Sequence, residues 1–498
     1  MSTLLLAPSR GRVSTRQFVA VLVGAVILVG LAFVPGPLHP DEAGYLMVAR
    51  AWHLGGPNLY GHYFVDRPPA LIALFRVASW VHWDPFVRVL TVPFAALFVV
   101  SAAWAAHQLV GDRGARWAGA AAAALVVTPL VQPHEADGEI FAAPLVMLAA
   151  ALTIAAVRRR GGRAGGFAVL AGLAAGLAVM TKQNFADAFV FAAALLLASV
   201  VQHRLPWRDG LIVTLGGLAG GTVVLLGAVG YVVLTRVGVT TAWFSLFGFR
   251  GTALDVIADS SLHAPFDRGV VLVLLAVLTG ILPVAVLLLR EGWRCHFSGP
   301  PVAWAVAATM AVEVAGIAAG GSYWPHYLLQ LAPMTALAVG LWAPHLRSVR
   351  LAGTGVLVSA VVAVVVGLVG TAFAGPSSGQ QTGEWIRASG RPGDTATVLY
   401  GNAQLQEATG MASPYRQLWS LPTRTIDAHL RHLRALLAGP RRPDWVVVWS
   451  KIDLWNIDPH GATRLELATH YHLVRRVCGH QVWLRDGEHR NLAPPPVC

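Results

Sequence analysis

Residues 18–42 read FVAVLVGAVILVGLAFVPGPLHPDE, an apolar run that ends in a short polar island. A helix needs roughly 17–25 apolar residues to cross a bilayer, and Phe18 to Val34 reaches that length without a charge. The island His39-Pro40-Asp41-Glu42 follows closely. Two adjacent carboxylates beside a span are costly unless they face water, a cation or a substrate. We therefore expect a membrane protein whose first loop carries chemistry.

The composition supports the membrane interpretation. The chain has 498 residues, of which 55% are hydrophobic and 12% are charged, whereas soluble domains carry about 25% charged residues. The net charge is +12, but the arginines lie in short loops between apolar runs. This distribution is typical of membrane orientation, whereas nucleic-acid binding needs basic residues on one face. We expect lipid contact and no nucleic-acid partner.

The predicted fold is an all-α polytopic membrane bundle of about eleven spans, with juxtamembrane helices and a small C-terminal α/β domain. The runs predicted to span are 18–35, 86–109, 117–132, 140–157, 166–181, 186–201, 211–235, 270–290, 301–320, 325–343 and 351–374. If the N-terminus is cytoplasmic, every arginine-rich loop falls on the cytoplasmic side, as the positive-inside rule requires. The sequence thus predicts a multi-pass plasma-membrane protein.

This orientation needs the apolar run 70–81 to lie on the outer membrane surface, because it is too short to span. Residues 42–52 have a helical pattern, with Asp41 as the expected N-cap. The transmembrane domain is predicted to occupy 1–374, with its first outer loop at 36–85. A linker at 375–381 and an extracytoplasmic domain at 382–498 follow.

The C-terminal domain is predicted from a change of pattern after Phe373. Strand-like runs occur at 397–400 and 445–449, helical patterns at 425–437 and 463–469, and a hairpin is expected around Gly479. Cys478 and Cys498 could pair if this domain lies in an oxidising compartment.

The polar groups of the membrane region gather on the predicted outer side. Asp41 is the candidate general base, with Glu42 as a weaker supporting acid and Glu139 as a third candidate catalytic group. The alternative is a purely structural role for each acid, as a helix N-cap or as a first-turn acid favoured by the helix dipole. His134, Glu135 and Asp137 are weak candidates for metal ligands, so the binding of a Mg²⁺ or Mn²⁺ ion is left open.

Candidate substrate-binding groups lie on the same side. Asp66 and Arg67 precede Pro68-Pro69, and Lys182 is the only lysine of the membrane region. Such cations grip phosphates, although they also snorkel to lipid headgroups. The remaining candidates, Tyr323, His326 and Tyr327, open a late span, where an aromatic belt is the common alternative.

These motifs together resemble the GT-C class of polyprenyl-phosphate-sugar-dependent glycosyltransferases. The likeness is greatest to the branch of protein O-mannosyltransferases and aminoarabinose transferases. It rests on the acidic pair after the first span, the Asp66-Arg67-Pro68-Pro69 stretch, Glu139, residues 176–182 (GLAVMTK) and residues 323–333 (YWPHYLLQLAP).

The resemblance implies an inverting transferase that moves a hexose or pentose from a polyprenyl-phosphate donor to a cell-envelope glycan, lipid or protein. Asp41 would be the general base. Arg67 and Lys182 would hold the lipid phosphate, Glu139 would position the acceptor or a cation, and His326 and Tyr327 would line the lipid-side cavity. The alternatives are a transporter or flippase of a lipid-linked sugar and a non-catalytic assembly subunit. Sugar and acceptor are left open.

Overall fold

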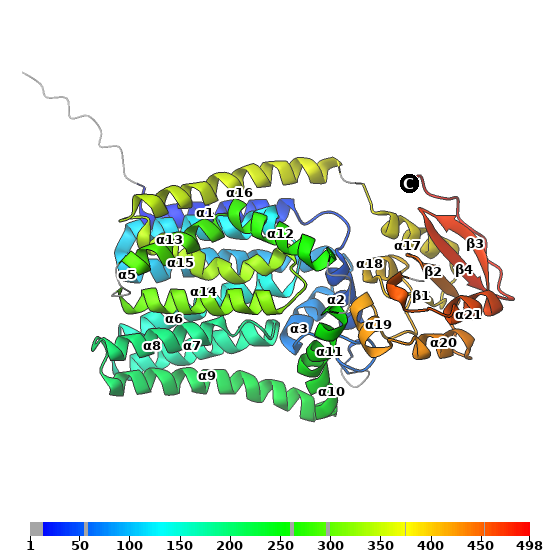
Figure 1. The fold of residues 1–498 in the computed structure, drawn as a ribbon, viewed down its shortest axis with the longest axis horizontal. Coiled ribbons are helices and arrows are strands. Elements are labelled where there is room, and N and C mark those ends of the chain that lie inside the picture. Colours follow the sequence, from blue (N-terminus) through cyan, green and yellow to red (C-terminus); the bar gives the residue numbers. More distant parts are fainter. Residues whose placement is uncertain (1–12, 54–57, 259–262, 295–298, 374, 453) are drawn as a thin grey trace, which may run out of the picture.

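The computed structural model describes residues 13–53, 58–258, 263–294, 299–373, 375–452 and 454–498 of the chain. Long helices run side by side in a bundle, and a small α/β domain lies at one end of it (Figure 1). The long helices are α1 (Thr15–Ala32), α5 (Thr91–Val127), α6 (Gly138–Val157), α7 (Gly161–Thr181), α8 (Asp187–Val201), α9 (Trp207–Leu234), α12 (His263–Leu278), α13 (Ile281–Arg294), α14 (Pro301–Ala319), α15 (Ala332–Trp342) and α16 (Arg347–Phe373).

Several of these helices are long and apolar enough to cross a membrane. In the described part of the chain seven pass by length and composition, or eight if the bent pair α12 and α13 forms one span. The chain is thus a multi-pass membrane protein. Each of the eleven predicted runs overlaps a helix. The run 117–132 extends past the end of α5 at Val127, however, and the run 270–290 crosses the 72° bend between α12 and α13. α8 has only 15 residues, so the number of spans stays a prediction.

One predicted pair of spans is joined in an unexpected way. α5 runs from Thr91 to Val127 without a loop and so contains most of the predicted runs 86–109 and 117–132. Inside it only Gly111 leaves helical geometry, with φ 74° and ψ −158°. A Cβ on Gly119 would lie 3.4 Å from the Cβ of Ala103, so the two arms fold back on each other at Gly111. Glycine adopts positive φ at little cost, and this turn preserves the alternation of the chain between the two ends of the bundle.

The bundle separates a protein-facing centre from lipid-facing edges. In the apolar 18-residue stretch of α6, 83% of the residues are buried, whereas in that of α9 only 11% are buried. α9 meets α7 through small residues: a Cβ on Gly172 would lie 1.9 Å from the carbonyl oxygen of Gly217. Such close backbone approach is typical of helix packing in membranes.

Short elements cover the end of the bundle that faces the small domain (Figure 1). They are α2 (Pro40–Ala51), α3 (Pro69–Ala78), α4 (Phe86–Val89), η1 (Pro129–Val131), α10 (Val239–Trp243), the π-helix η2 (Phe244–Gly248), α11 (Phe249–Ala258) and η3 (Pro325–Leu331). α2 and α3 confirm the two predicted loop helices. The predicted N-cap was wrong: His39 is the N-cap and Pro40 the first helical residue, because proline has the φ angle that this position needs and no N–H to leave unpaired.

The C-terminal domain is a four-stranded mixed sheet with helices. Its strands β1 (Ala396–Val398), β2 (Trp445–Val448), β3 (Tyr471–Val477) and β4 (His480–Arg485) lie in the order β1-β2-β4-β3. β1 and β2 are parallel, and the other pairs are antiparallel. The helices are α17 (Ser378–Ser389), α18 (Ala403–Ala408), α19 (Ser420–Ile426), α20 (Arg431–Ala438), η4 (Leu454–Asn456) and α21 (Ala462–His470).

The predicted hairpin and cysteine pair are both present in this domain. β3 and β4 turn at Cys478 and Gly479, which both have positive φ, as a two-residue hairpin of this kind requires. Cys478 forms a disulfide with Cys498. The bridge ties the C-terminus of the chain to the tip of the hairpin.

The domain is joined to the first loop of the bundle by hydrogen bonds. The N–H of Ser413 donates to the hydroxyl of Tyr63 over 3.0 Å, and the N–H of Phe64 donates to the carbonyl of Arg416 over 3.0 Å. The segment 413–419 therefore lies against α2 and the loop that follows it.

Candidate active site

Asp41 lies in the first turn of α2 and is held by two donors from different parts of the chain. The indole N–H of Trp419 donates to Oδ1 over 2.9 Å, and the Tyr45 hydroxyl lies 3.3 Å from Oδ2. Gly44 makes room for the indole, because a Cβ there would lie 2.1 Å from its Cζ2 atom. Burial, and next the charge of Asp137, raise the pKa of Asp41, while Arg67 opposes the shift. A carboxylate of raised basicity in a fixed orientation suits a general base.

Glu42, one residue on, has a different environment. Its side chain is 1% exposed and forms a bidentate ion pair with Arg88, with oxygen–nitrogen distances of 2.8 and 2.6 Å. It also accepts from the backbone N–H groups of His39 and Ala136, each at 2.8 Å. Burial raises the pKa of Glu42, but Arg88 outweighs it and holds the pKa below its usual range. This carboxylate joins three chain segments and has little capacity left for substrate.

Asp66 and Arg67 lie together just before α3. Arg67 pairs with Asp66 at 2.7 Å, and Arg250 of α11 pairs with the other Asp66 oxygen at 2.7 Å. The Arg67 guanidinium lies 5.5 Å from the ring centre of Tyr45. Because the hydroxyl of the same tyrosine contacts Asp41, Tyr45 connects the guanidinium to that carboxylate. Nε of Arg67 is buried without a hydrogen-bond partner in the structure. This N–H is a donor available to a bound anion.

Lys182 and Glu139 form a buried ion pair between α7 and the first turn of α6. His326 lies 3.3 Å from Asp137 and 3.8 Å from Glu139. The Lys182 ammonium is 5.1 Å from the ring centre of Tyr327. Burial raises the pKa of Asp137, but His326 and then Lys182 outweigh it and hold the pKa well below its usual range. Two carboxylates, an imidazole and a lysine thus meet at one point.

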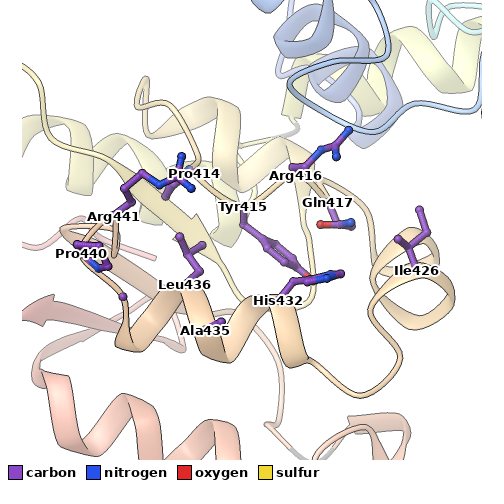
Figure 2. Close-up of a pocket in the computed structure, with 11 residues that line it drawn as sticks. Pro414, Tyr415, Arg416, Gln417, Ile426, His432, Ala435, Leu436, Pro440 and Arg441 are labelled. Atoms are coloured by element: carbon purple, nitrogen blue, oxygen red, sulfur yellow. The ribbon is translucent and has the colours of Figure 1, made fainter. Parts of the chain in front are cut away.

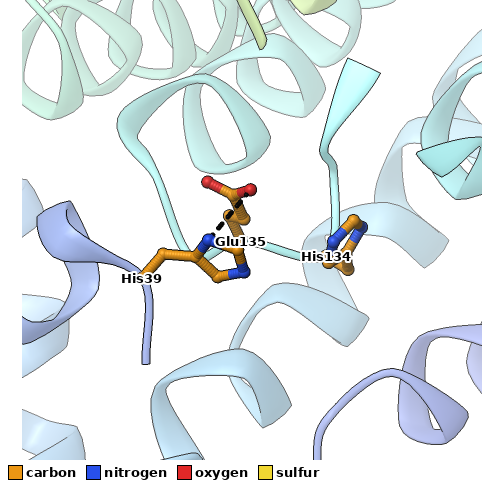
Figure 3. Close-up of side chains that lie close together, drawn as sticks. All are labelled: His39, His134 and Glu135. Atoms are coloured by element: carbon orange, nitrogen blue, oxygen red, sulfur yellow. Dashed lines mark ion pairs between the residues drawn. The ribbon is translucent and has the colours of Figure 1, made fainter. Parts of the chain in front are cut away.

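The weak metal trio of the sequence analysis is divided between two clusters. His134 and Glu135 join His39, and Asp137 joins Glu139 and His326; the ligand atoms of each cluster lie within 4.8 Å of one another. Figure 3 shows His39 at the start of α2 beside the loop that carries His134 and Glu135. Burial and neighbouring carboxylates, Glu42 first, raise the pKa of Glu135 to about 9.

The remaining sequence candidate, Tyr323, has a local backbone role. Its hydroxyl donates to the carbonyl of Ala318 over 3.0 Å, and its φ is 54°. In the described structure the hydroxyl therefore meets the end of α14, whereas His326 and Tyr327 meet the acidic cluster.

Sequence reasoning missed three residues that contact the site and one buried acid of the bundle. Arg88, Arg250 and Trp419 have partners far along the chain, so no local pattern reveals them. The fourth, Glu313, is fully buried in α14. An acid inside an apolar run marks function by default, so this signal was visible in the sequence.

A hollow of about 460 Å³ opens in the C-terminal domain (Figure 2). Tyr415 and Gln417 line it on one side, and His432 and Leu436 of α20 line it on another. Arg416 extends from it toward the first loop, where it donates to the carbonyl of Tyr60 over 3.3 Å. The hollow and the Trp419 contact thus belong to one stretch of chain.

Solved structures share this architecture. ArnT from Cupriavidus metallidurans in the apo state superposes with a TM-score of 0.64 at 16% identity, covering 94% of this chain and 98% of that one. The same protein bound to undecaprenyl phosphate gives 0.62 at 14% identity, covering 94% and 97%. The apo oligosaccharyltransferase of Archaeoglobus fulgidus gives 0.57 at 12% identity, covering 91% and 73%.

No family model and no curated protein sequence matches the chain. The structural neighbours are GT-C glycosyltransferases, and the likeness extends over bundle and C-terminal domain together. The resemblance inferred from the sequence is therefore confirmed at the level of the fold. At these identities the comparison establishes architecture, and the chemistry has to be argued from the residues of this chain.

Proposed function

We propose that the protein is an inverting glycosyltransferase that moves a sugar from a polyprenyl phosphate to a hydroxyl acceptor of the cell envelope. One observation carries the proposal. A carboxylate of raised basicity, Asp41, lies in the same cluster as two buried cations, Arg67 and Lys182. Such a reaction needs a base to take the acceptor proton and cations to hold the leaving phosphate. The neighbour bound to undecaprenyl phosphate supports the donor class.

The reaction follows from these groups. Asp41 takes the proton of the acceptor hydroxyl as its oxygen attacks the anomeric carbon. The bond from that carbon to the phosphate oxygen breaks, and the bonding electrons leave with the polyprenyl phosphate. Arg67 and Lys182 stabilise the charge that develops there, which is the largest catalytic contribution in many enzymes. Attack opposite the leaving group inverts the anomeric configuration.

The cluster of Asp137, Glu139 and His326 also fits a divalent cation. Oε2 of Glu139 is buried and has no hydrogen-bond partner in the structure, and carboxylates with an imidazole are a common ligand set. A cation held by these three residues would add positive charge beside the leaving phosphate. In the structure the Lys182 ammonium already places one positive charge beside Glu139.

We assign supporting roles to three further residues. Glu42, sequestered by Arg88, holds α2 against the loop that carries Asp137. Trp419 orients Asp41 from the C-terminal domain and so makes that domain part of the active site. Tyr327 packs against Lys182 and lines the lipid side of the clamp.

The proposed orientation places this end of the bundle outside the cytoplasm. The turns at the opposite end carry the arginines, including Arg158, Arg159 and Arg160 after α6, as the positive-inside rule requires of the cytoplasmic side. The Cys478–Cys498 disulfide is consistent with an oxidising compartment for the C-terminal domain.

The decisive experiment measures sugar transfer in proteoliposomes supplied with radiolabelled polyprenyl-phosphate sugars and an envelope extract as acceptor. We expect Asp41→Asn to lower transfer by about 10²–10⁴-fold, the usual contribution of a general base. Asp84→Asn is the matched control, because Asp84 pairs with Arg50 at a more exposed place in the same loop. Retention of transfer by Asp41→Asn would remove the base assignment. Absence of transfer by the wild type from every such donor would favour a transporter or an assembly subunit.

A further inference from the structure

The cluster of His39, His134 and Glu135 has the composition and spacing of a metal site, and the proposed reaction does not use it. Nδ1 of His39 lies 3.2 Å from Oε1 of Glu135. Two ligand atoms, each about 2.0–2.1 Å from a tetrahedral zinc ion, are themselves about 3.3 Å apart. The first pair of ligands therefore already has the separation that one zinc ion imposes.

The third group is free to complete the set. Nδ1 of His134 is buried and has no hydrogen-bond partner in the structure. Phe33 stacks on the ring, with centroids 5.2 Å apart, and so limits its rotation. A buried imidazole nitrogen without a partner costs free energy, and a metal ion would remove that cost.

The carboxylates of Glu42 and Asp137 near Glu135 favour a dication. The one nearby guanidinium among the described residues, that of Arg88, is itself paired with Glu42. Among the described residues no lysine or arginine pairs with Glu135, whose side chain is 12% exposed. The side chain of Gln132 donates to Oε1 of Glu135 over 2.8 Å, an outer contact of the kind that orients metal-binding carboxylates. The His39 side chain is 40% exposed, so an ion can enter from solvent.

We propose that His39, His134 and Glu135 bind one zinc ion, which ties the N-terminus of α2 to the loop 132–137. His39 lies two residues before Asp41, and Glu135 lies two residues before Asp137. The ion would thus hold together the two segments that carry the acids of the active site. This site is separate from the cluster of Asp137, Glu139 and His326, and its existence does not depend on the transfer reaction.

The test is the zinc content of the purified full-length protein, stripped with a chelator and reloaded in zinc-buffered solution, measured by mass spectrometry. We expect one zinc equivalent in the wild type, none in His134→Ala, and one in His326→Ala, which alters the other cluster. The pair of imidazoles suits zinc, whereas the carboxylate-rich cluster of Asp137, Glu139 and His326 suits Mg²⁺ or Mn²⁺. Gln132→Ala keeps all three ligands and should weaken zinc affinity by about 10–100-fold, so the proposal does not depend on the folding of a ligand variant.

A second measurement uses Co²⁺ in place of zinc, because tetrahedral nitrogen–oxygen ligation gives an intense visible spectrum that His134→Ala should abolish. Zinc should also raise the unfolding temperature of the wild type and leave that of His134→Ala unchanged. A wild type that retains no zinc would overturn the proposal. So would loss of zinc from His326→Ala, alone or together with His134→Ala, because the ion would then belong to the other cluster.

Discussion

The hydrogen bond from Trp419 to Asp41 yields the sharpest prediction. Trp419→Phe retains an aromatic ring beside Tyr45 and removes the N–H that donates to Oδ1. A hydrogen bond to a charged group contributes about 1.5–3 kcal/mol, and each 1.36 kcal/mol of activation free energy changes a rate tenfold. If the bond orients the base during attack, kcat should fall about 10- to 100-fold.

The pH dependence provides an independent check on the same residue. Asp41 acts as a base only when ionised, and burial raises its pKa, so kcat should increase with pH as the carboxyl deprotonates. The indole N–H stabilises the ionised form. Its removal should raise the pKa further, so in Trp419→Phe the increase in kcat should occur at higher pH. The KM for the lipid donor should stay unchanged, because the indole does not contact Arg67 or Lys182.

The assay is steady-state transfer in proteoliposomes across a pH series. Trp483→Phe is the matched control, because its indole donates to Gln481 within the sheet. Gly44→Ala tests the same contact from the other side, since the added methyl displaces the indole, while Gly24→Ala adds a methyl in open space. Unchanged kcat and pH dependence in both Trp419→Phe and Gly44→Ala would refute the role of Trp419.

Three further changes test other parts of the structure. Arg88→Leu leaves Glu42 buried without its cation and should lower stability by about 3–5 kcal/mol, measured as thermal unfolding in detergent. Lys182→Met should destabilise the bundle for the same reason; adding Glu139→Gln should restore its melting temperature but not its affinity for undecaprenyl phosphate, as titration would show. Cys498→Ser opens a bridge across 20 residues and should cost the C-terminal domain about 3 kcal/mol, seen as faster proteolysis of that domain alone.

Most helices and the strand pattern could be predicted because their signals are local. The predicted helical pattern 425–437 was wrong in part, since α19 ends at Ile426 and α20 begins at Arg431. Apolar runs fall on the helices of the bundle, and the runs at 397–400 and 445–449 overlap β1 and β2. The N-cap of α2 was misassigned because the preference of proline for the first helical position outweighs the capping preference of aspartate. Both preferences act locally, so Pro40 could have indicated the correct N-cap from the sequence alone.

The pairing of the polar groups could not be predicted in the same way. Sequence reasoning placed Asp41, Arg67, Glu139 and Lys182 at one end of the bundle, and all four meet there. It did not pair Lys182 with Glu139, because helix rotation decides which side chains of neighbouring helices meet. Trp419 was invisible for a stronger reason: its partner is 378 residues away in the chain.

That separation has a consequence for biosynthesis. A chain is made from its N-terminus onward, so Asp41 enters the membrane early, while Trp419 emerges only when most of the chain exists. Until the segment 413–419 has docked on α2, the carboxylate lacks the donor that orients it. Under the proposed mechanism, a nascent or truncated chain therefore holds a base that is not yet oriented, and transfer becomes possible only once the C-terminal domain has folded.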